Sequence, residues 1–150
     1  RNGNILYRQI YSELKNEDTL KNDIIKELLM HLDDKCDVYC PLSLGDHVDH
    51  VFVNSIGRAL EFMRYKVIYY EDFPYVSDSS MVSYMGKTKE LKMYQEELDE
   101  KHYIDRISSI LCYKSQILII WKSVEKLLNN IKELYLRNGA AYSIRFWIKK

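Results

Sequence analysis

The sequence predicts an α/β fold: a partial doubly wound, Rossmann-like and mostly parallel sheet with flanking helices and a helical C-terminal segment. Between residues 19 and 70, segments with helical spacing of apolar residues alternate with short apolar runs. From Tyr103 to Arg137, apolar residues recur at heptad-like spacing. Alternation of helices and strands favours parallel pairing, because a crossover helix returns the chain to the same end of the sheet.

The alternating half begins with a helix that Asp18 or Thr19 can cap. The first strand is largely buried and ends near Pro41, because proline cannot continue a central strand. The turn Ser43-Leu44-Gly45 then leads into the second helix. These elements are predicted at residues 19–32 (helix), 36–42 (strand), 46–65 (helix) and 66–70 (strand).

The second half of the chain gives weaker signals. Residues 76–86 are rich in serine and predict a loop that could cover a pocket. Residues 87–100 suggest a polar helix or irregular structure. One long helix or two consecutive helices are expected over 103–137, ended by Gly139. Residues 143–148 partly alternate, which suits a final strand or a docking tail.

Length and composition favour one domain over residues 1–150. Twenty-two basic residues balance 22 acidic ones, so the charge does not indicate a nucleic acid or an anionic membrane as partner. The longest apolar run, Ile117–Trp121, is far shorter than the roughly 20 residues of a membrane-spanning helix, and no secretory leader is visible. A cytoplasmic protein is therefore expected. The chain opens on Arg1, so its native start is expected upstream.

Three cysteines, an odd number, suggest reduced thiols. Cys36 and Cys40 fall on the predicted strand, where a spacing of four residues separates them by about 13 Å. That distance is too great for both to bind one zinc ion. Cys36 and Cys40 are therefore expected to be buried thiols.

Two of the four histidines, His47 and His50, follow the first strand with Asp49 between them. With Asp46 as helix cap, both histidines would lie in the first turn on one face. Neutral imidazole binds zinc, and a carboxylate can orient the ring, so the segment predicts a metal-dependent hydrolase. A catalytic zinc normally takes three protein ligands, more than this segment supplies. In the alternative interpretation the two aspartates complement the helix dipole and the histidines are merely exposed.

The other histidines are weaker candidates. His31-Leu32-Asp33-Asp34 resembles a metal-binding run, but it precedes the strand, so its side chains should project toward the opposite end of the sheet. We interpret it as a decoy. His102 lies in a charged segment with no evident partner and is expected to be a surface residue.

At His47-Val48-Asp49-His50 the sequence resembles the PIG-L/LmbE family of zinc-dependent N-acetylglucosaminyl deacetylases, whose later motif is His-x-Asp-His after a proline and a glycine-containing turn. Three further segments are similar to family elements in the same order, and the matches cover most of residues 37–147. They are Tyr69–Tyr75 with its Glu-Asp-x-Pro-Tyr pattern, Tyr113–Gln116 with Tyr-x-Ser-Gln, and Gly139–Trp147 with Arg-Phe-Trp.

The resemblance implies a site and a reaction. His50 would be the third zinc ligand, His47 would assist the tetrahedral intermediate or protonate the departing amine, and Asp49 would tune or orient a histidine. The substrate would be an N-acetylglucosamine-type or related N-acylated sugar or glycoconjugate, and homo-oligomers are compatible with it. No substrate-binding residues are predicted. Val51 departs from the family pattern, which often has arginine there.

The earlier His-Pro-Asp-Asp-Glu motif of the family, which carries the other zinc ligands and the general base, is absent from this sequence. The chain therefore resembles the C-terminal portion of such an enzyme and is expected to be inactive alone. A noncatalytic LmbE-like sugar-binding or interaction domain is the alternative. An unrelated α/β domain with structural histidines is a third possibility, favoured if His47 and His50 point away from the strand ends.

Overall fold

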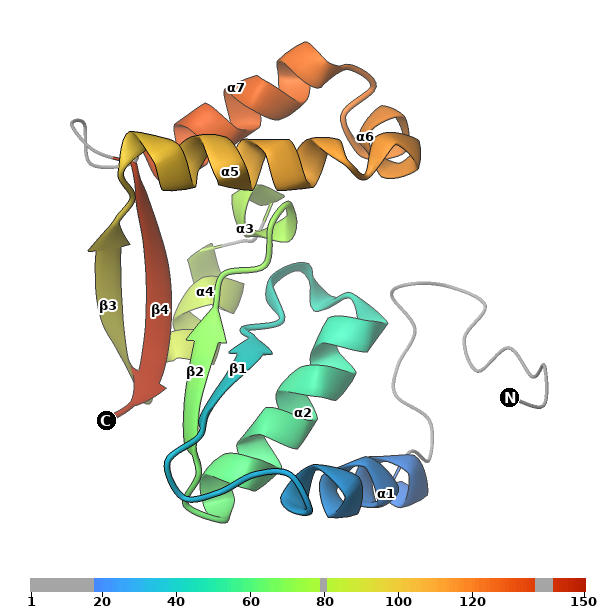
Figure 1. Cartoon of the computed structure of the whole chain (residues 1–150), viewed down its shortest axis with the longest axis vertical. Coiled ribbons are helices and arrows are strands. Elements are labelled where there is room, and N and C mark those ends of the chain that lie inside the picture. The colour runs from blue at the N-terminus through green and yellow to red at the C-terminus, as the bar shows by residue number, and fades with distance from the viewer. Residues whose placement is uncertain (1–17, 79–80, 137–141) are drawn as a thin grey trace. The chain divides into compact units, whose positions relative to one another are not determined.

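The computed structural model describes residues 18–78, 81–136 and 142–150 (Figure 1). The chain divides into two compact units, which are Arg1–Met93 with Phe146–Lys150, and Tyr94–Arg145. The first unit contains α1 (Asp18–Leu29), β1 (Asp37–Pro41), the 3-10 turn η1 (Leu44–Asp46), α2 (Val48–Phe62), β2 (Lys66–Tyr70), α3 (Tyr75–Asp78) and α4 (Met81–Thr88). The second contains α5 (Glu100–Leu111), α6 (Lys114–Ile120) and α7 (Val124–Tyr135). Strands β3 (Leu91–Glu97) and β4 (Ser143–Lys149) each contribute residues to both units.

The predicted α/β class is confirmed, and the order α1-β1-α2-β2 matches the alternation expected from the sequence. α1 begins at Asp18 itself and ends at Leu29, three residues earlier than expected. Asp18 and Thr19 are therefore the first two residues of the helix. The capping position before Asp18 lies outside the described residues. α2 begins at Val48, two residues later than expected. This shift changes the surroundings of both candidate histidines.

The sheet has the order β1-β2-β4-β3 and is mixed. β1 and β2 pair in parallel, with Tyr39 opposite Ile68. β4 pairs antiparallel to β2, with Trp147 opposite Tyr69, and Figure 1 shows it running opposite to both neighbours. The prediction of parallel pairing is therefore correct for β1 and β2, whereas the antiparallel strand β4 makes the sheet mixed. β1 forms one edge of the sheet.

Helix α2 packs on β1 and β2, and α1 packs on α2 (Figure 1). Leu60 of α2 and Tyr69 of β2 are fully buried in this contact. Gly57 lets the helix approach closely, because an added Cβ would lie 2.7 Å from the Cys40 Sγ. Burial raises the pKa of the Cys40 thiol to about 11. Cys40 is the buried thiol that was expected, whereas Cys36 is half-buried just before the strand.

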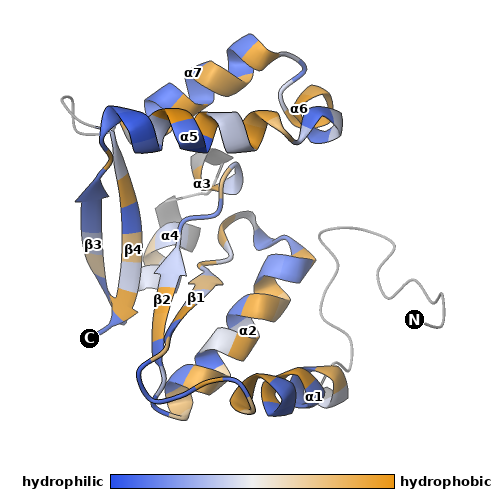
Figure 2. Ribbon diagram, in the orientation of Figure 1, coloured by the Kyte–Doolittle hydropathy of each residue, from blue (hydrophilic) through white to orange (hydrophobic). Residues whose placement is uncertain are grey.

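Two predictions for the middle of the chain are wrong. The segment expected to be a loop over 76–86 contains α3 and α4, although residues 79 and 80 lie outside the described ranges. The segment expected to be helical or irregular over 87–100 contains β3. Figure 2 shows β3 as mostly hydrophilic, and only Leu91 of the strand is buried. Such a strand has no apolar alternation, and its support is pairing with β4, about 50 residues away in the sequence.

The helical region of the second unit has three helices where one or two were expected. The break before α7 is made by Lys122, which has a left-handed φ of 64°, and by Ser123, whose Oγ accepts the Lys126 backbone N–H. Leu127 and Ile131 of α7 are fully buried. The expected stop at Gly139 lies outside the described residues, and residues 143–148 form a strand as one alternative anticipated. Among the described helices, none has the length and apolarity to cross a bilayer.

Candidate functional site

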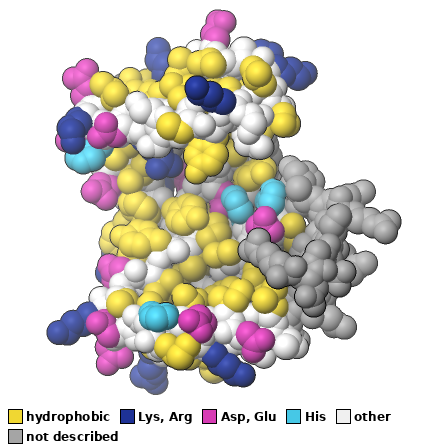
Figure 3. All heavy atoms as spheres, turned by 45° about the vertical axis from the view of Figure 1, so that its right-hand side comes forward, with side chains coloured by type: hydrophobic (Ala, Val, Ile, Leu, Met, Phe, Trp, Pro, Cys, Tyr) yellow, Lys and Arg dark blue, Asp and Glu magenta, His cyan; other side chains and the backbone are white. Residues whose placement is uncertain are grey.

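The candidate site lies where β1 and β2 end, entirely within the first unit. Because the two strands are parallel, the segments that leave them meet at one edge of the sheet. The segment after β1 carries His47 and His50, and the segment after β2 carries Asp72 and Tyr75. The ring centroids of the two histidines are 5.1 Å apart, and Tyr75 lies 5.7 Å from the His47 ring and 5.4 Å from the His50 ring. Figure 3 shows two neighbouring histidine side chains at the surface with acidic side chains beside them.

A tight turn places the first histidine. Ser43, Gly45 and Asp46 have φ values of 61°, 77° and 55°, all in the left-handed region. Asp46 therefore lies in the turn and is not the helix cap that the sequence predicted. The cap of α2 is His47, whose Nδ1 accepts the backbone N–H of Asp49 at 3.2 Å. His47 thus lies one residue before the helix and His50 in its first turn.

Contacts from other elements hold this turn. The Lys87 ammonium of α4 donates to the Ser43 carbonyl at 2.5 Å and lies 2.6 Å from the Asp46 Oδ1. Gly45 packs against Tyr75, and a Cβ at Gly45 would lie 2.5 Å from the Tyr75 Cβ. The turn keeps three left-handed residues because lysine and tyrosine from distant segments fix it in place.

His50 faces a buried carboxylate. Its Nδ1 lies 2.9 Å from Oδ1 of Asp72, whose side chain is fully buried while that of His50 is 31% exposed. Oδ2 of Asp72 accepts the Leu44 backbone N–H at 2.7 Å. The imidazole–carboxylate contact lacks the alignment of a standard hydrogen bond, and neither atom has a hydrogen-bond partner among the described residues. Two lone pairs at this distance would repel, so the His50 Nδ1 carries the hydrogen.

The two rings therefore have opposite tautomers when neutral. His50 has its hydrogen on Nδ1, which leaves the Nε2 lone pair available, and no described residue bonds to that atom. His47 uses its Nδ1 lone pair to accept the Asp49 N–H, so its hydrogen is on Nε2. One ring presents a lone pair and the other an N–H donor. This pairing suits a metal ligand beside a hydrogen-bond donor.

Asp49 and Asp72 have different relations to the histidines. Asp49 bonds to His47 through its backbone, and it is exposed. At this site the carboxylate that contacts a histidine ring is that of Asp72, a residue that the sequence analysis did not select. Asp72 comes two residues after the end of β2. Because the ends of parallel strands lie at the same edge of a sheet, this position could have indicated that Asp72 lies near the histidines. The negative charge of Asp72 is also the second cause, after burial, of a raised pKa at Tyr70.

The remaining histidines belong to other segments, the residues after α1 and helix α5. His31 is exposed after α1, with its Nε2 3.4 Å from the Glu27 Oε1. His102 is also exposed, as expected, but it does have a partner: Asp99 caps α5 and accepts the His102 backbone N–H at 2.7 Å. This backbone bond is the main reason why the pKa of Asp99 is lowered. Within the described ranges, no group of three or more His, Cys, Asp or Glu side chains could hold a metal ion.

No protein-family model matches the sequence, and no match was found among curated proteins. Solved structures do resemble it. The A40926 pseudoaglycone deacetylase Dbv21 has a TM-score of 0.72 at 16% identity, over 89% of this chain and 58% of its own. A deacetylase of teicoplanin biosynthesis, solved as a bog complex, has a TM-score of 0.74 at 16% identity, over 91% and 56%. The zinc-inhibited form of teicoplanin deacetylase Orf2 has 0.69 at 17% identity, over 97% and 58%.

These values show a shared fold. The chain spans a little over half the length of each of these deacetylases, while nearly all of the chain takes part in the match. The chain thus has the α/β fold of a large part of these deacetylase structures.

Proposed function

We propose that this chain is the C-terminal portion of a PIG-L/LmbE-like zinc-dependent deacetylase, which removes an acyl group from an N-acetylglucosamine-type sugar or glycoconjugate. The observation that carries the proposal is the contact that each ring makes: Nδ1 of His50 lies 2.9 Å from the buried Asp72 Oδ1, and Nδ1 of His47 accepts the Asp49 backbone N–H. The fold shared with the A40926 pseudoaglycone deacetylase and the deacetylase of teicoplanin biosynthesis supports it.

His50 fits the role of one zinc ligand. A ligating histidine typically gives its second ring nitrogen to a carboxylate, which fixes the tautomer, and Asp72 occupies that position. A catalytic zinc needs about three protein ligands. Since the described residues supply no such group, the other ligands would come from the upstream portion. When bound, zinc would act as a Lewis acid toward the acyl group or water.

His47 fits the role of hydrogen-bond donor. Its Nε2–H belongs to a ring 5.1 Å from the His50 ring, so a substrate group near one ring would be within reach of the other. In this neutral form the Nε2–H would donate a hydrogen bond to the tetrahedral intermediate, because a ring protonated on both nitrogens could not accept the Asp49 N–H. Asp49 would keep the ring in this orientation through its backbone N–H. The general base would be contributed by the upstream portion.

Two features of the sheet support an upstream portion. Among the described strands, β1 lies at an edge of the sheet, where a further strand could pair. On the face away from α2, Tyr39 is 57% exposed and Tyr70 40% exposed. Exposed aromatic side chains beside an open edge are typical of a surface that another part of a doubly wound domain covers. The chain alone would therefore be inactive.

The test uses the full-length protein with single alanine substitutions. His50→Ala should lose stoichiometric zinc and acetate release, because the Nε2 donor is gone. His47→Ala should keep zinc and lose most turnover. His102→Ala is the matched control, since that ring lies on the exposed surface of α5, and it should change neither. Unchanged zinc content and activity in both site variants would reject the proposal and favour a noncatalytic binding domain.

A further inference from the structure

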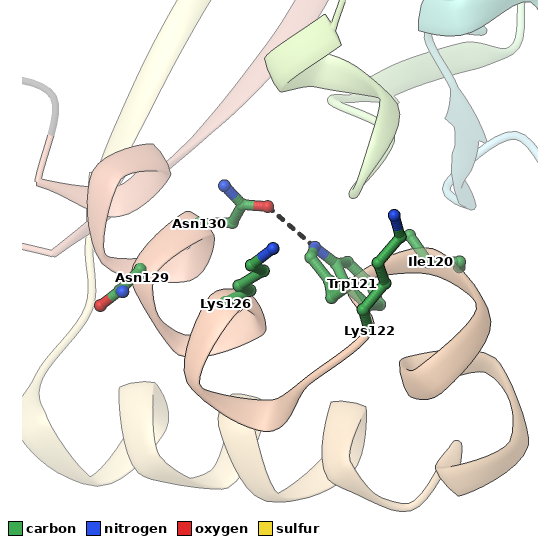
Figure 4. A pocket seen from close by; sticks show the side chains of 6 residues that line it. All are labelled: Ile120, Trp121, Lys122, Lys126, Asn129 and Asn130. Atoms are coloured by element: carbon green, nitrogen blue, oxygen red, sulfur yellow. Dashed lines mark hydrogen bonds between the residues drawn. The ribbon is translucent and has the colours of Figure 1, made fainter.

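A pocket of about 310 Å³ lies in the second unit, where α6 ends and α7 begins (Figure 4). Its volume is at the lower end of the range for small-molecule sites. The lining residues are Ile120, Trp121, Lys122, Lys126, Asn129 and Asn130. Figure 4 shows the hydrogen bond that joins Trp121 to Asn130, with the end of the Lys126 side chain drawn below it in this view. No carboxylate lines the pocket.

The hydrogen-bonding groups that remain in this pocket are mainly donors. The Trp121 indole N–H donates to the Asn130 Oδ1 at 2.9 Å. Because indole can only donate, the Asn130 amide must turn its oxygen to Trp121, and its NH₂ group remains for another partner. Lys122 and Lys126 add ammonium groups, which have donors and no acceptor.

Neither lysine is neutralised by a neighbour. Among the described residues, no ion pair or hydrogen bond involves the ammonium of Lys122 or Lys126. Two like charges beside one pocket repel each other. Ser123 accepts one of the backbone N–H groups at the start of α7, that of Lys126. Lys122 also has a left-handed φ of 64°, which is costly for a side chain with a Cβ. Both lysine side chains are exposed, so an anion from solvent can reach their ammonium groups.

We propose that this pocket binds an oxyanion, a phosphate or carboxylate group carried by a small ligand, through Lys122, Lys126 and the Asn130 amide. An oxyanion accepts several hydrogen bonds at once and neutralises both ammonium groups. The inference is independent of the proposed deacetylase site, since it rests on residues of the second unit alone.

The two tryptophans of the chain allow a direct test by NMR. Trp121 lines the pocket and its indole N–H donates to Asn130, another lining residue, whereas the Trp147 indole N–H is buried on β4. Inorganic phosphate and acetate are titrated separately at constant ionic strength. In at least one titration the Trp121 signal should shift saturably while the Trp147 signal stays in place. The arm that saturates identifies the ligand group. If neither titration saturates, or if both indoles shift alike, the proposal is rejected.

Substitutions then show whether the lysines hold the anion. Lys126→Gln should weaken binding about tenfold, the loss expected for one charge-assisted hydrogen bond. Lys122→Gly should weaken binding similarly without lowering the melting temperature, because glycine adopts the left-handed conformation freely. Lys132→Gln removes the same charge from α7 outside the pocket and should bind as the wild type does. Wild-type affinity in both pocket variants would overturn the assignment, as would equal weakening in Lys132→Gln.

Discussion

The substitution Gly45→Ala tests whether the turn before His47 is held as the structure shows. Gly45 has a φ of +77°, and an added Cβ would lie 2.5 Å from the Cβ and 2.9 Å from the Cγ of Tyr75. These Tyr75 atoms are next to the backbone of α3, so they cannot swing aside as the end of a long side chain would. Either the turn or α3 must move.

The expected cost has two parts. A residue with a Cβ in the left-handed region costs about 1–2 kcal/mol relative to the normal conformation. Forcing an extra carbon into a packed contact costs about 1–3 kcal/mol. We therefore expect Gly45→Ala to lower the free energy of unfolding by about 3 kcal/mol.

Urea denaturation followed by circular dichroism measures this change. Gly86→Ala is the matched control, because a Cβ at Gly86 in α4 meets no atom within 4 Å. It should raise the free energy of unfolding by about 0.5–1 kcal/mol, since alanine favours a helix over glycine. If the two variants had equal stability, or if Gly45→Ala lost less than about 1 kcal/mol, the left-handed turn against Tyr75 would be wrong.

Three further predictions concern the same unit. Lys87→Met should lower the free energy of unfolding by about 1 kcal/mol, because the contacts with Ser43 and the half-exposed ion pair with Asp46 are lost. Urea denaturation measures this change. Gly57→Ala should destabilise the protein by about 1–3 kcal/mol, and Cys40→Ala should restore part of that loss by removing the Sγ that the new Cβ meets. Finally, the folded Cys40 thiol has a raised pKa of about 11 against an ordinary 9.0, so its contribution to stability is complete below pH 9.0. That contribution should be lost as the pH rises toward about 11, since the unfolded thiol ionises first, and Cys40→Ala should lack this part of the alkaline decline in denaturation curves.

Local sequence patterns were sufficient where an element buries one of its faces. The apolar stripe of α2 and the short run of β2 have such faces, and both elements were predicted close to their observed bounds. α4 and β3 were missed. The serines before α4 are typical of loops, and β3 buries only its first residue. Pairing with β4, far away in the sequence, determines the conformation of β3, and no local pattern carries that information.

The sequence predicted some features of the candidate site and missed others. The spacing of His47 and His50 was sufficient to place both rings near each other. The partner of His50 was not found, because Asp72 is 22 positions further along and reaches His50 only through the parallel pairing of β1 and β2. The role of Asp46 was also misjudged, since its left-handed φ and its contact with Lys87 are tertiary features.

The tautomers of the two histidines test the central claim most directly. Long-range ¹⁵N NMR of the rings, at a pH where both are neutral, reports which nitrogen carries the hydrogen. The structure predicts hydrogen on Nδ1 of His50, facing Asp72, and on Nε2 of His47, whose Nδ1 accepts a backbone N–H. Hydrogen on Nε2 of His50 would remove the lone pair that the metal requires and would contradict the account.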